Sequence, residues 1–124
     1  MSVSTAPLSN PQRGEVWHVD FDPARGAEIR KTRPAVMLNV MTAGKLPLRV
    51  IVPLTEWQPP FARAFWMVRV EPDSANGLSK PSAADAFQVR SFALERFAER
   101  TGTFTLEQTE AVARAVAAVV GHAP

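Results

Sequence analysis

The sequence predicts a single, mainly β domain that ends in one helix. Eleven prolines and three tryptophans in 124 residues favour many short strands separated by loops over a helical bundle. Apolar residues alternate along several short runs, and the apolar period lengthens to about 3.6 residues only near the C-terminus. The simplest architecture is a small curled sheet of antiparallel strands with the C-terminal helix laid across its open end.

The composition limits the classes of site and of environment. The absence of cysteine excludes disulfides and thiolate metal sites. The formal charge is only +2, so the global charge does not by itself indicate a nucleic-acid binder. The apolar runs are too short to span a membrane, and residues 1–10 lack the features of a secretory signal. We therefore expect a soluble, cytoplasmic protein without a membrane partner.

The chain divides into a tail and one domain. Residues 1–12 are rich in Ser, Thr and Pro and are expected to form a flexible N-terminal tail. Residues 13–122 then form the folded domain. No repeat or second domain is indicated.

The first strand is expected over residues 15–20. Alternation gives it a more polar face (Val16, His18, Asp20) and a core face (Trp17, Val19, Phe21). A single histidine on the polar face is more typical of a surface residue than of a catalytic base.

A polar loop over residues 22–34 separates this strand from the next, expected at 35–40. The loop carries four cations and two carboxylates: Arg25, Arg30, Lys31, Arg33, Asp22 and Glu28. Guanidinium groups match phosphate oxygens two hydrogen bonds at a time, so the loop suits a phosphate backbone. The alternative is a solvated hairpin tip, and charge alone does not choose between the two.

Arg33 is the cation most suited to hold one particular oxygen. The following proline, Pro34, restricts Arg33 to extended geometry at the mouth of the second strand. A fixed guanidinium can stabilise charge at a defined atom, whereas a mobile one only attracts charge.

The next strand is expected over residues 48–52, after a turn at 42–45, and Pro53 should limit it to an edge or a bulge. Thr55 lies at its end. Its hydroxyl could face a ligand, or Thr55 could simply be a β-former that fills the strand terminus.

Further short strands follow a break at residues 58–61. We expect strands at 64–70 and, after an Asn-Gly turn at 73–77, near Leu78 and at 85–92. Alternation places Gln88 and Arg90 on one face, opposite Phe87, Val89 and Ser91. Gln88 and Arg90 are either paired surface residues or one wall of a ligand groove.

The C-terminal part contains a last strand and the helix. The strand is expected over residues 96–101, ended by Gly102. Thr105 and Gln108 form a capping box, and Gly121 ends the helix. The apolar face of the helix is expected to contain Leu106, Val112, Val116, Val119 and Val120.

Few reaction chemistries fit this set of residues. Two distant histidines, His18 and His122, do not make a metal site or a serine triad, and Gly26 stands without the further glycines of a phosphate loop. No metal or cofactor is expected. Any reaction would depend on arginine, threonine and a carboxylate.

RNA cleavage is a reaction of this kind, because the RNA 2'-hydroxyl can attack the adjacent phosphorus. The protein must orient the phosphate, stabilise charge and assist proton transfer. Arg33 and Thr55 would hold the phosphate. Arginine keeps its proton near neutral pH, so Glu28 is the better base, unless it only orients neighbouring cations.

Residues 13–40, RGEVWHVDFDPARGAEIRKTRPAVMLNV, resemble the opening of the MazF/PemK toxins. The family pattern is an RG pair before an acid, an apolar residue and Trp, then DxDPxxGxE, then RP before an apolar strand. The motifs VPLT, ending at Thr55, and QVRS, at residues 88–91, extend the resemblance, as does the C-terminal helix.

The resemblance implies an SH3-like (CcdB/MazF-like) barrel and a homodimer. It also implies a metal-independent endoribonuclease that cleaves single-stranded RNA at short motifs. A cognate antitoxin would inhibit it by placing an acidic and apolar tail in the RNA groove. Arg33 and Thr55 match the family's catalytic positions, Glu28 matches the loop acid, and Gln88, Arg90 and Ser91 match the groove wall. Arg25, Arg30 and Lys31 would contact RNA.

One position departs from the family pattern, and two alternatives stay open. Many relatives carry an acid directly before the Gln-Val/Ile-Lys/Arg motif, where this chain has Phe87, with Asp85 two residues earlier. One alternative is a non-catalytic CcdB-like toxin that binds a protein target such as gyrase. The intact pair of Arg33 and Thr55 argues against it. The other is an RNA-binding module without toxicity.

Overall fold

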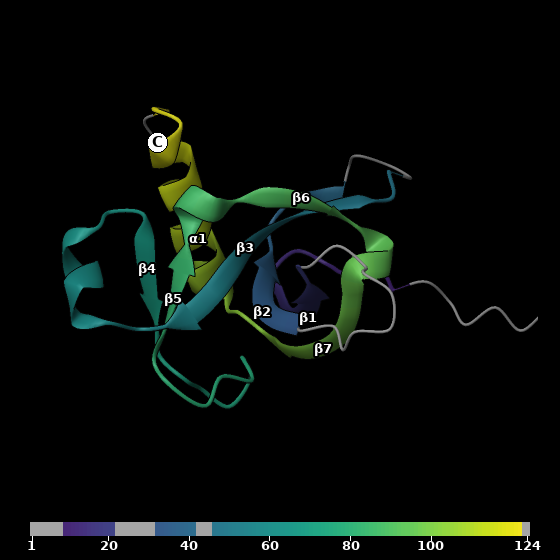
Figure 1. Ribbon diagram of the computed structural model, residues 1–124, viewed down its shortest axis with the longest axis horizontal. Helices are drawn as coiled ribbons and strands as arrows, with labels where there is room; N and C mark the ends of the chain where they lie inside the picture. The colour runs from purple at the N-terminus through teal and green to yellow at the C-terminus, as the bar shows by residue number, and fades with distance from the viewer. Residues whose placement is uncertain (1–8, 22–31, 42–45, 123–124) are drawn as a thin grey trace, which may run out of the picture.

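The computed structural model describes residues 9–21, 32–41 and 46–122 and shows an antiparallel sheet with one C-terminal helix (Figure 1). The strands are β1 (Glu15–Asp20), β2 (Thr32–Met37), β3 (Leu48–Glu56), β4 (Met67–Val70), β5 (Ser82–Asp85), β6 (Arg90–Ala93) and β7 (Phe97–Thr103). Short 3-10 helices lie at η2 (Pro59–Arg63), η3 (Ala86–Gln88) and η4 (Leu94–Arg96), and the α-helix is α1 (Leu106–Val119). The predicted mainly β fold with a C-terminal helix is confirmed.

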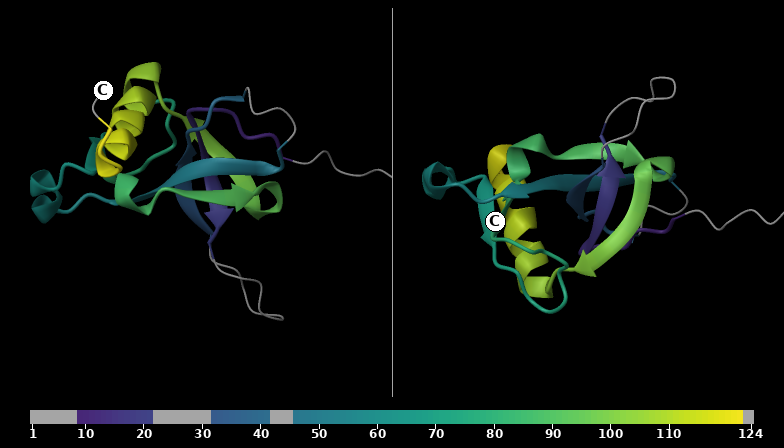
Figure 2. Two further views of the ribbon diagram at one scale, coloured as in Figure 1. Left: turned by 90° about the horizontal axis from the view of Figure 1, so that it is seen from above. Right: turned by 60° about the horizontal axis from the view of Figure 1, so that its bottom comes forward.

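The sheet curls into a barrel-like shape. Its strand order is β4-β5-β3-β2-β1-β7, and β6 also pairs with β3. Strands β6 and β7 lie at the margins of the sheet but are consecutive in the chain, joined through η4. Figure 2 shows the resulting curl. Within the described residues the hydrogen-bonded ladder does not join β7 back to β6, so the expected barrel takes the form of an open, curled sheet.

Strand β1 contributes to two hydrophobic clusters. Val16 is fully buried in one cluster with Val112 of α1, and Val19 is fully buried in the other with Phe92 and Phe97. The prediction of a polar face was therefore wrong for Val16, and Asp20 on the same face is also buried. The β1–β7 ladder has register shifts after Val16 and after His18, and irregularities of this kind bend a strand. In a sheet that also curls, both faces of β1 are covered.

Strand β3 continues through Pro53 to Glu56, so the prediction that this strand is limited by its proline was wrong. Its residues 48–51 pair with β6 and its residues 54–56 pair with β5, on the side away from β2. Pro53 lies between these two ladders. A residue without an N–H is tolerated where a strand changes partner.

The predicted strand over residues 85–92 is interrupted by η3. The Asp85 side chain caps this short helix by accepting a hydrogen bond from the backbone N–H of Phe87, at 3.2 Å. Such local side-chain bonds compete with a strand ladder. Gln88 and Arg90 therefore do not belong to one continuous strand.

Two glycines let the 73–77 turn pack against β7. A Cβ on Gly77 would lie 2.2 Å from the carbonyl oxygen of Thr101, and one on Gly102 would lie 2.3 Å from the carbonyl carbon of Asn76. The turn was predicted correctly. Gly102 does not end the strand as expected, because β7 runs through it to Thr103.

Helix α1 has the predicted capping box between Thr105 and Gln108. It packs on β4 and η3 and buries Thr109, Val112 and Ala115. Leu106 and Val120 are 73% and 72% exposed, so they lie outside the packed face, contrary to the periodicity. None of the helices in the described ranges is long and apolar enough to cross a membrane.

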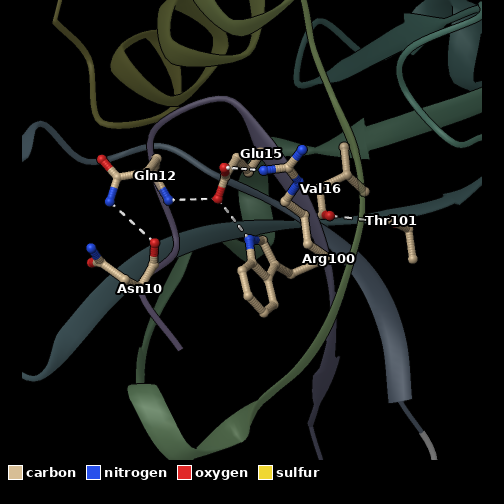
Figure 3. Close-up of polar contacts among 7 residues, drawn as sticks. Asn10, Gln12, Glu15, Val16, Arg100 and Thr101 are labelled. Atoms are coloured by element: carbon tan, nitrogen blue, oxygen red, sulfur yellow. Dashed lines mark hydrogen bonds and ion pairs between the residues drawn. The ribbon is translucent and has the colours of Figure 1, made fainter. Parts of the chain in front are cut away.

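Residues 9–12, which the sequence assigns to the tail, are attached to the sheet. Pro11 is fully buried, and its carbonyl accepts a hydrogen bond from the buried Arg49 at 3.1 Å. The Glu15 carboxylate accepts from the Gln12 backbone N–H at 2.8 Å and from Arg100 at 3.0 Å (Figure 3). We propose that the domain begins by residue 9. Residues 1–8 lie outside the described ranges.

Candidate active site

A cleft of about 700 Å³ opens where β2 and β3 separate. Its lining comes from β2, β3, η2, β4, β6 and the β5–η3 corner, and from the end of β1: Phe21, Arg33, Pro53, Leu54, Thr55, Phe61, Met67, Asp85, Gln88 and Arg90. It combines two arginines with apolar side chains, so it suits a ligand that is both anionic and partly apolar.

Arg33 and Thr55 lie together in this cleft. The last β2–β3 pair is Ala35 with Pro53, and the same register carried two residues further places Arg33 opposite Thr55. Beyond that pair, Arg33 pairs with Val19 of β1 and Thr55 pairs with Ala83 of β5. The ladder between the two strands ends at Ala35 and Pro53, and the exposed Arg33 and Thr55 line the cleft beyond it.

The opposite wall contains a carboxylate that the sequence did not single out as a site residue. Asp85 accepts a hydrogen bond from the Gln88 side chain at 3.0 Å, and both residues line the cleft. The signal for it was the short capping turn, in which an Asp precedes Phe87 by two residues. Asp85 fixes the direction of the Gln88 amide.

Two aromatic rings contact Arg90, an exposed residue that lines the cleft. Its guanidinium lies 5.6 Å from the centroid of the Phe21 ring and 4.7 Å from that of Phe92. The two rings meet edge to face with centroids 5.0 Å apart. Cation–π contacts of this kind orient a guanidinium without neutralising its charge, so Arg90 stays available to an anion.

The remaining predicted site residues are distributed differently. Ser91 is exposed, pairs with Val50 in the β3–β6 ladder and does not line the cleft. Four predicted residues from the polar loop lie outside the described ranges: Arg25, Glu28, Arg30 and Lys31.

A second cavity of about 330 Å³ adjoins the cleft and shares Leu54 and Thr55 with it. His18 lines this cavity, and its Nδ1 lies 3.2 Å from the Thr32 hydroxyl oxygen. At another wall, Lys80 forms a salt bridge with Glu56 at 3.4 Å. Thr55 therefore lies at the boundary between the cleft and the second cavity.

Comparison with known families explains this arrangement. Residues 12–120 match the family described as PemK-like, MazF-like toxin of type II toxin-antitoxin system. The chain belongs to the PemK/MazF-like toxin family.

Individual relatives agree with this family. The Mycobacterium tuberculosis protein named Endoribonuclease MazF9 is 34% identical over 97 residues, which is 73% of this chain and 80% of that protein. MazE-MazF from Deinococcus radiodurans superposes with a TM-score of 0.71 and 23% identity, over 90% of this chain and 96% of that one. A mycobacterial endoribonuclease in complex with its cognate antitoxin superposes with a TM-score of 0.69 and 18% identity, over 90% of this chain and 96% of that one. The structural matches confirm the PemK/MazF-like fold.

Proposed function

We propose that this PemK/MazF-like toxin is an endoribonuclease that cuts single-stranded RNA at a short sequence motif. The observation that carries the proposal is the cleft shared by Arg33 and Thr55. The name of the M. tuberculosis relative, an endoribonuclease, supports the reaction class.

The proposed reaction is a transesterification within the RNA. The 2'-oxygen forms a bond to the adjacent phosphorus while the bond from phosphorus to the 5'-oxygen breaks. A cyclic phosphate and a 5'-hydroxyl result. Both nucleophile and leaving group belong to the substrate, so the reaction needs no metal ion or cofactor.

Arg33 and Thr55 stabilise the phosphorane in this scheme. The guanidinium donates two hydrogen bonds to the non-bridging oxygens, whose charge increases in the transition state. The Thr55 hydroxyl donates a further hydrogen bond from the other strand. Gln88 and Arg90 bind the flanking nucleotides from the opposite wall, where Asp85 and the rings of Phe21 and Phe92 orient them.

Proton transfer from the 2'-hydroxyl is assigned to Glu28, and the departing 5'-oxygen takes its proton from solvent water. Asp85 is a positioning residue, because its carboxylate already accepts hydrogen bonds from Gln88 and from the Phe87 backbone. Phe87 cannot supply the acid that many relatives carry at this point. The basic residues Arg25, Arg30 and Lys31, together with Ser91, stay predictions for RNA contact.

The physiological setting follows from the toxin–antitoxin family. We propose a homodimer in the cytoplasm, inhibited by a cognate antitoxin that places an acidic and apolar segment in the cleft. Arg33 and Arg90 would pair with the acids, and Phe61 and Met67 would contact the apolar side chains. Structures of MazE-MazF and of a mycobacterial endoribonuclease in complex with its cognate antitoxin support an antitoxin partner.

The test is cleavage of a long, defined RNA in EDTA, with the cut sites mapped by primer extension. We expect cuts at a recurring short motif that leave 5'-hydroxyl ends. Arg33→Ala should abolish them, whereas Arg114→Ala, at an exposed position on α1, should not. Absence of cleavage, with growth arrest retained on expression, would instead indicate a CcdB-like binder of a protein target.

A further inference from the structure

Five aromatic side chains gather beside the cleft and are not explained by the hydrophobic core. Trp57, Phe61, Phe65, Trp66 and Phe87 form what we call the aromatic patch. Phe65 and Phe87 are 62% and 60% exposed. The patch lies around η2 and η3, and Figures 1 and 2 both place η2 at one extremity of the molecule.

The rings of the patch support one another edge to face. The Phe65 and Phe87 rings stand nearly perpendicular to the Trp66 ring, at 90° and 78°, with centroids 5.2 and 5.6 Å from it. Trp57 and Phe61 form a second pair, at 83° and 5.8 Å. Such contacts orient the exposed rings before any ligand binds.

The patch meets the cleft at Phe61, which belongs to both. Phe61 itself lines the cleft beside Arg33 and Thr55. Phe87 precedes Gln88, which lines the opposite wall. A ligand strand that leaves the cleft past Phe61 would pass the other rings around η2 and η3.

Arginines lie among the rings, and the nearby described acids already have partners. The Arg69 guanidinium lies 5.1 Å from the centroid of the Trp57 ring and forms a salt bridge with Glu71. Arg63 is exposed on η2. Asp85 is engaged by Gln88. Exposed rings interleaved with arginine are typical of surfaces that bind unpaired bases.

We propose that the aromatic patch is a stacking surface for unpaired RNA bases that flank the cut phosphate. The inference rests on the proposed function, because the cleft supplies the phosphate-binding end of the same strand. Continuity with two cleft arginines favours RNA over a protein partner. Stacking is tolerant of base identity, so the patch adds affinity for single strands without fixing the sequence motif.

The first experiment measures binding of labelled, single-stranded 2'-O-methyl RNA, which lacks the attacking hydroxyl and cannot be cut. The full-length double variant Phe65→Ala/Phe87→Ala should raise the dissociation constant roughly tenfold or more. The matched control is Leu106→Ala/Val120→Ala, which removes two exposed apolar side chains at the ends of the helix. This control should bind like the wild type.

The second measurement separates stacking from a general structural role. Because the patch does not touch the reacting phosphate, Phe65→Ala/Phe87→Ala should raise KM and leave kcat unchanged. Phe65→Trp/Phe87→Trp should restore the wild-type KM. The patch variant and the helix control should have equal affinity for base-paired RNA of the same sequence, because its bases cannot reach the rings.

Two results would overturn the proposal. One is equal affinity of the patch variant and the helix control for the uncleavable RNA. The other is that the patch substitutions dissociate the dimer in sedimentation while the remaining dimer keeps its affinity for the RNA. That result would make the patch a protein interface. The binding assay does not require cleavage, so an inactive wild-type chain would disprove the proposed function without deciding this inference.

Discussion

Arg33 of β2 and Thr55 of β3 line one cleft, each two residues beyond the last pair of their ladder, Ala35 and Pro53. The strands are still close enough at this point to present both side chains to one cleft. They no longer pair with each other here, because the β2–β3 ladder ends at Ala35 and Pro53. The site is thus a consequence of how the sheet splits.

The first prediction concerns the shape of the Arg33 side chain. Arg33→Lys keeps the positive charge but loses the pair of parallel hydrogen bonds that a guanidinium donates. We therefore expect kcat to fall by about 10²-fold with no change in thermal stability. Single-turnover cleavage and a melting curve measure the two quantities. A lysine variant with wild-type kcat would show that only charge matters.

The second prediction concerns the Thr55 hydroxyl. Thr55→Val removes the donor at nearly constant volume and should lower kcat by about 10²-fold. Thr55→Ser keeps the hydroxyl and should retain most of the activity. The same single-turnover assay applies, and equal activity of the valine and serine variants would rule out a role for the hydroxyl.

The third prediction concerns Gly102. Because a Cβ there would meet the backbone of Asn76 at 2.3 Å, we expect Gly102→Ala to lower the free energy of unfolding by about 3 kcal/mol. Gly121→Ala, which meets no atom within 4 Å but has a φ of 81°, should cost only about 1 kcal/mol. Urea denaturation measures both, and equal losses would contradict the close packing.

The fourth prediction concerns the buried guanidinium of Arg49. It donates to the carbonyls of Pro11, Leu46 and Leu48 and to the Asn10 side chain. Arg49→Ala leaves these acceptors without a donor, so the free energy of unfolding should fall by about 3 kcal/mol. Limited proteolysis should then cut near residues 9–12, which the wild type protects. Unchanged protection would show that Arg49 does not hold this segment.

The fifth prediction concerns acid stability. Hydrogen bonds from the backbone of Ala75 and Asn76, and from the Gln108 side chain, lower the pKa of Asp73 from 3.8. A lowered folded-state pKa stabilises the fold above the unfolded-state value, and this contribution disappears as pH falls from about 3.8 through the folded pKa. Urea midpoints below pH 4 should therefore drop less in Asp73→Asn. Parallel pH curves for both proteins would contradict the assignment.

Local signals predicted the elements that depend on neighbours in the chain. The extent of β1, the capping box of Thr105 and the turn that ends at Gly77 were predicted correctly. Each is decided by a few consecutive residues. Arg33 was singled out by the proline that follows it, whereas the strand end left the role of Thr55 open and the family resemblance assigned it.

Features that depend on distant segments were missed. Val16 is buried because the sheet curls over it, and Pro53 is tolerated because β3 changes partner there. Gly102 is required by the turn at Asn76, on a separate segment of the chain. Asp85 enters the cleft through a cap that interrupts an apparent strand. No local pattern encodes these contacts between segments.

The central claim, that the RNA cuts itself while the protein holds the phosphate, is tested most directly by one substrate substitution. An RNA carrying a single 2'-deoxynucleotide before the mapped cut should resist cleavage there in EDTA, while the unmodified RNA is cut. Cleavage of the deoxy substrate at the same position and rate would show that the nucleophile is not the 2'-hydroxyl, and would contradict the account.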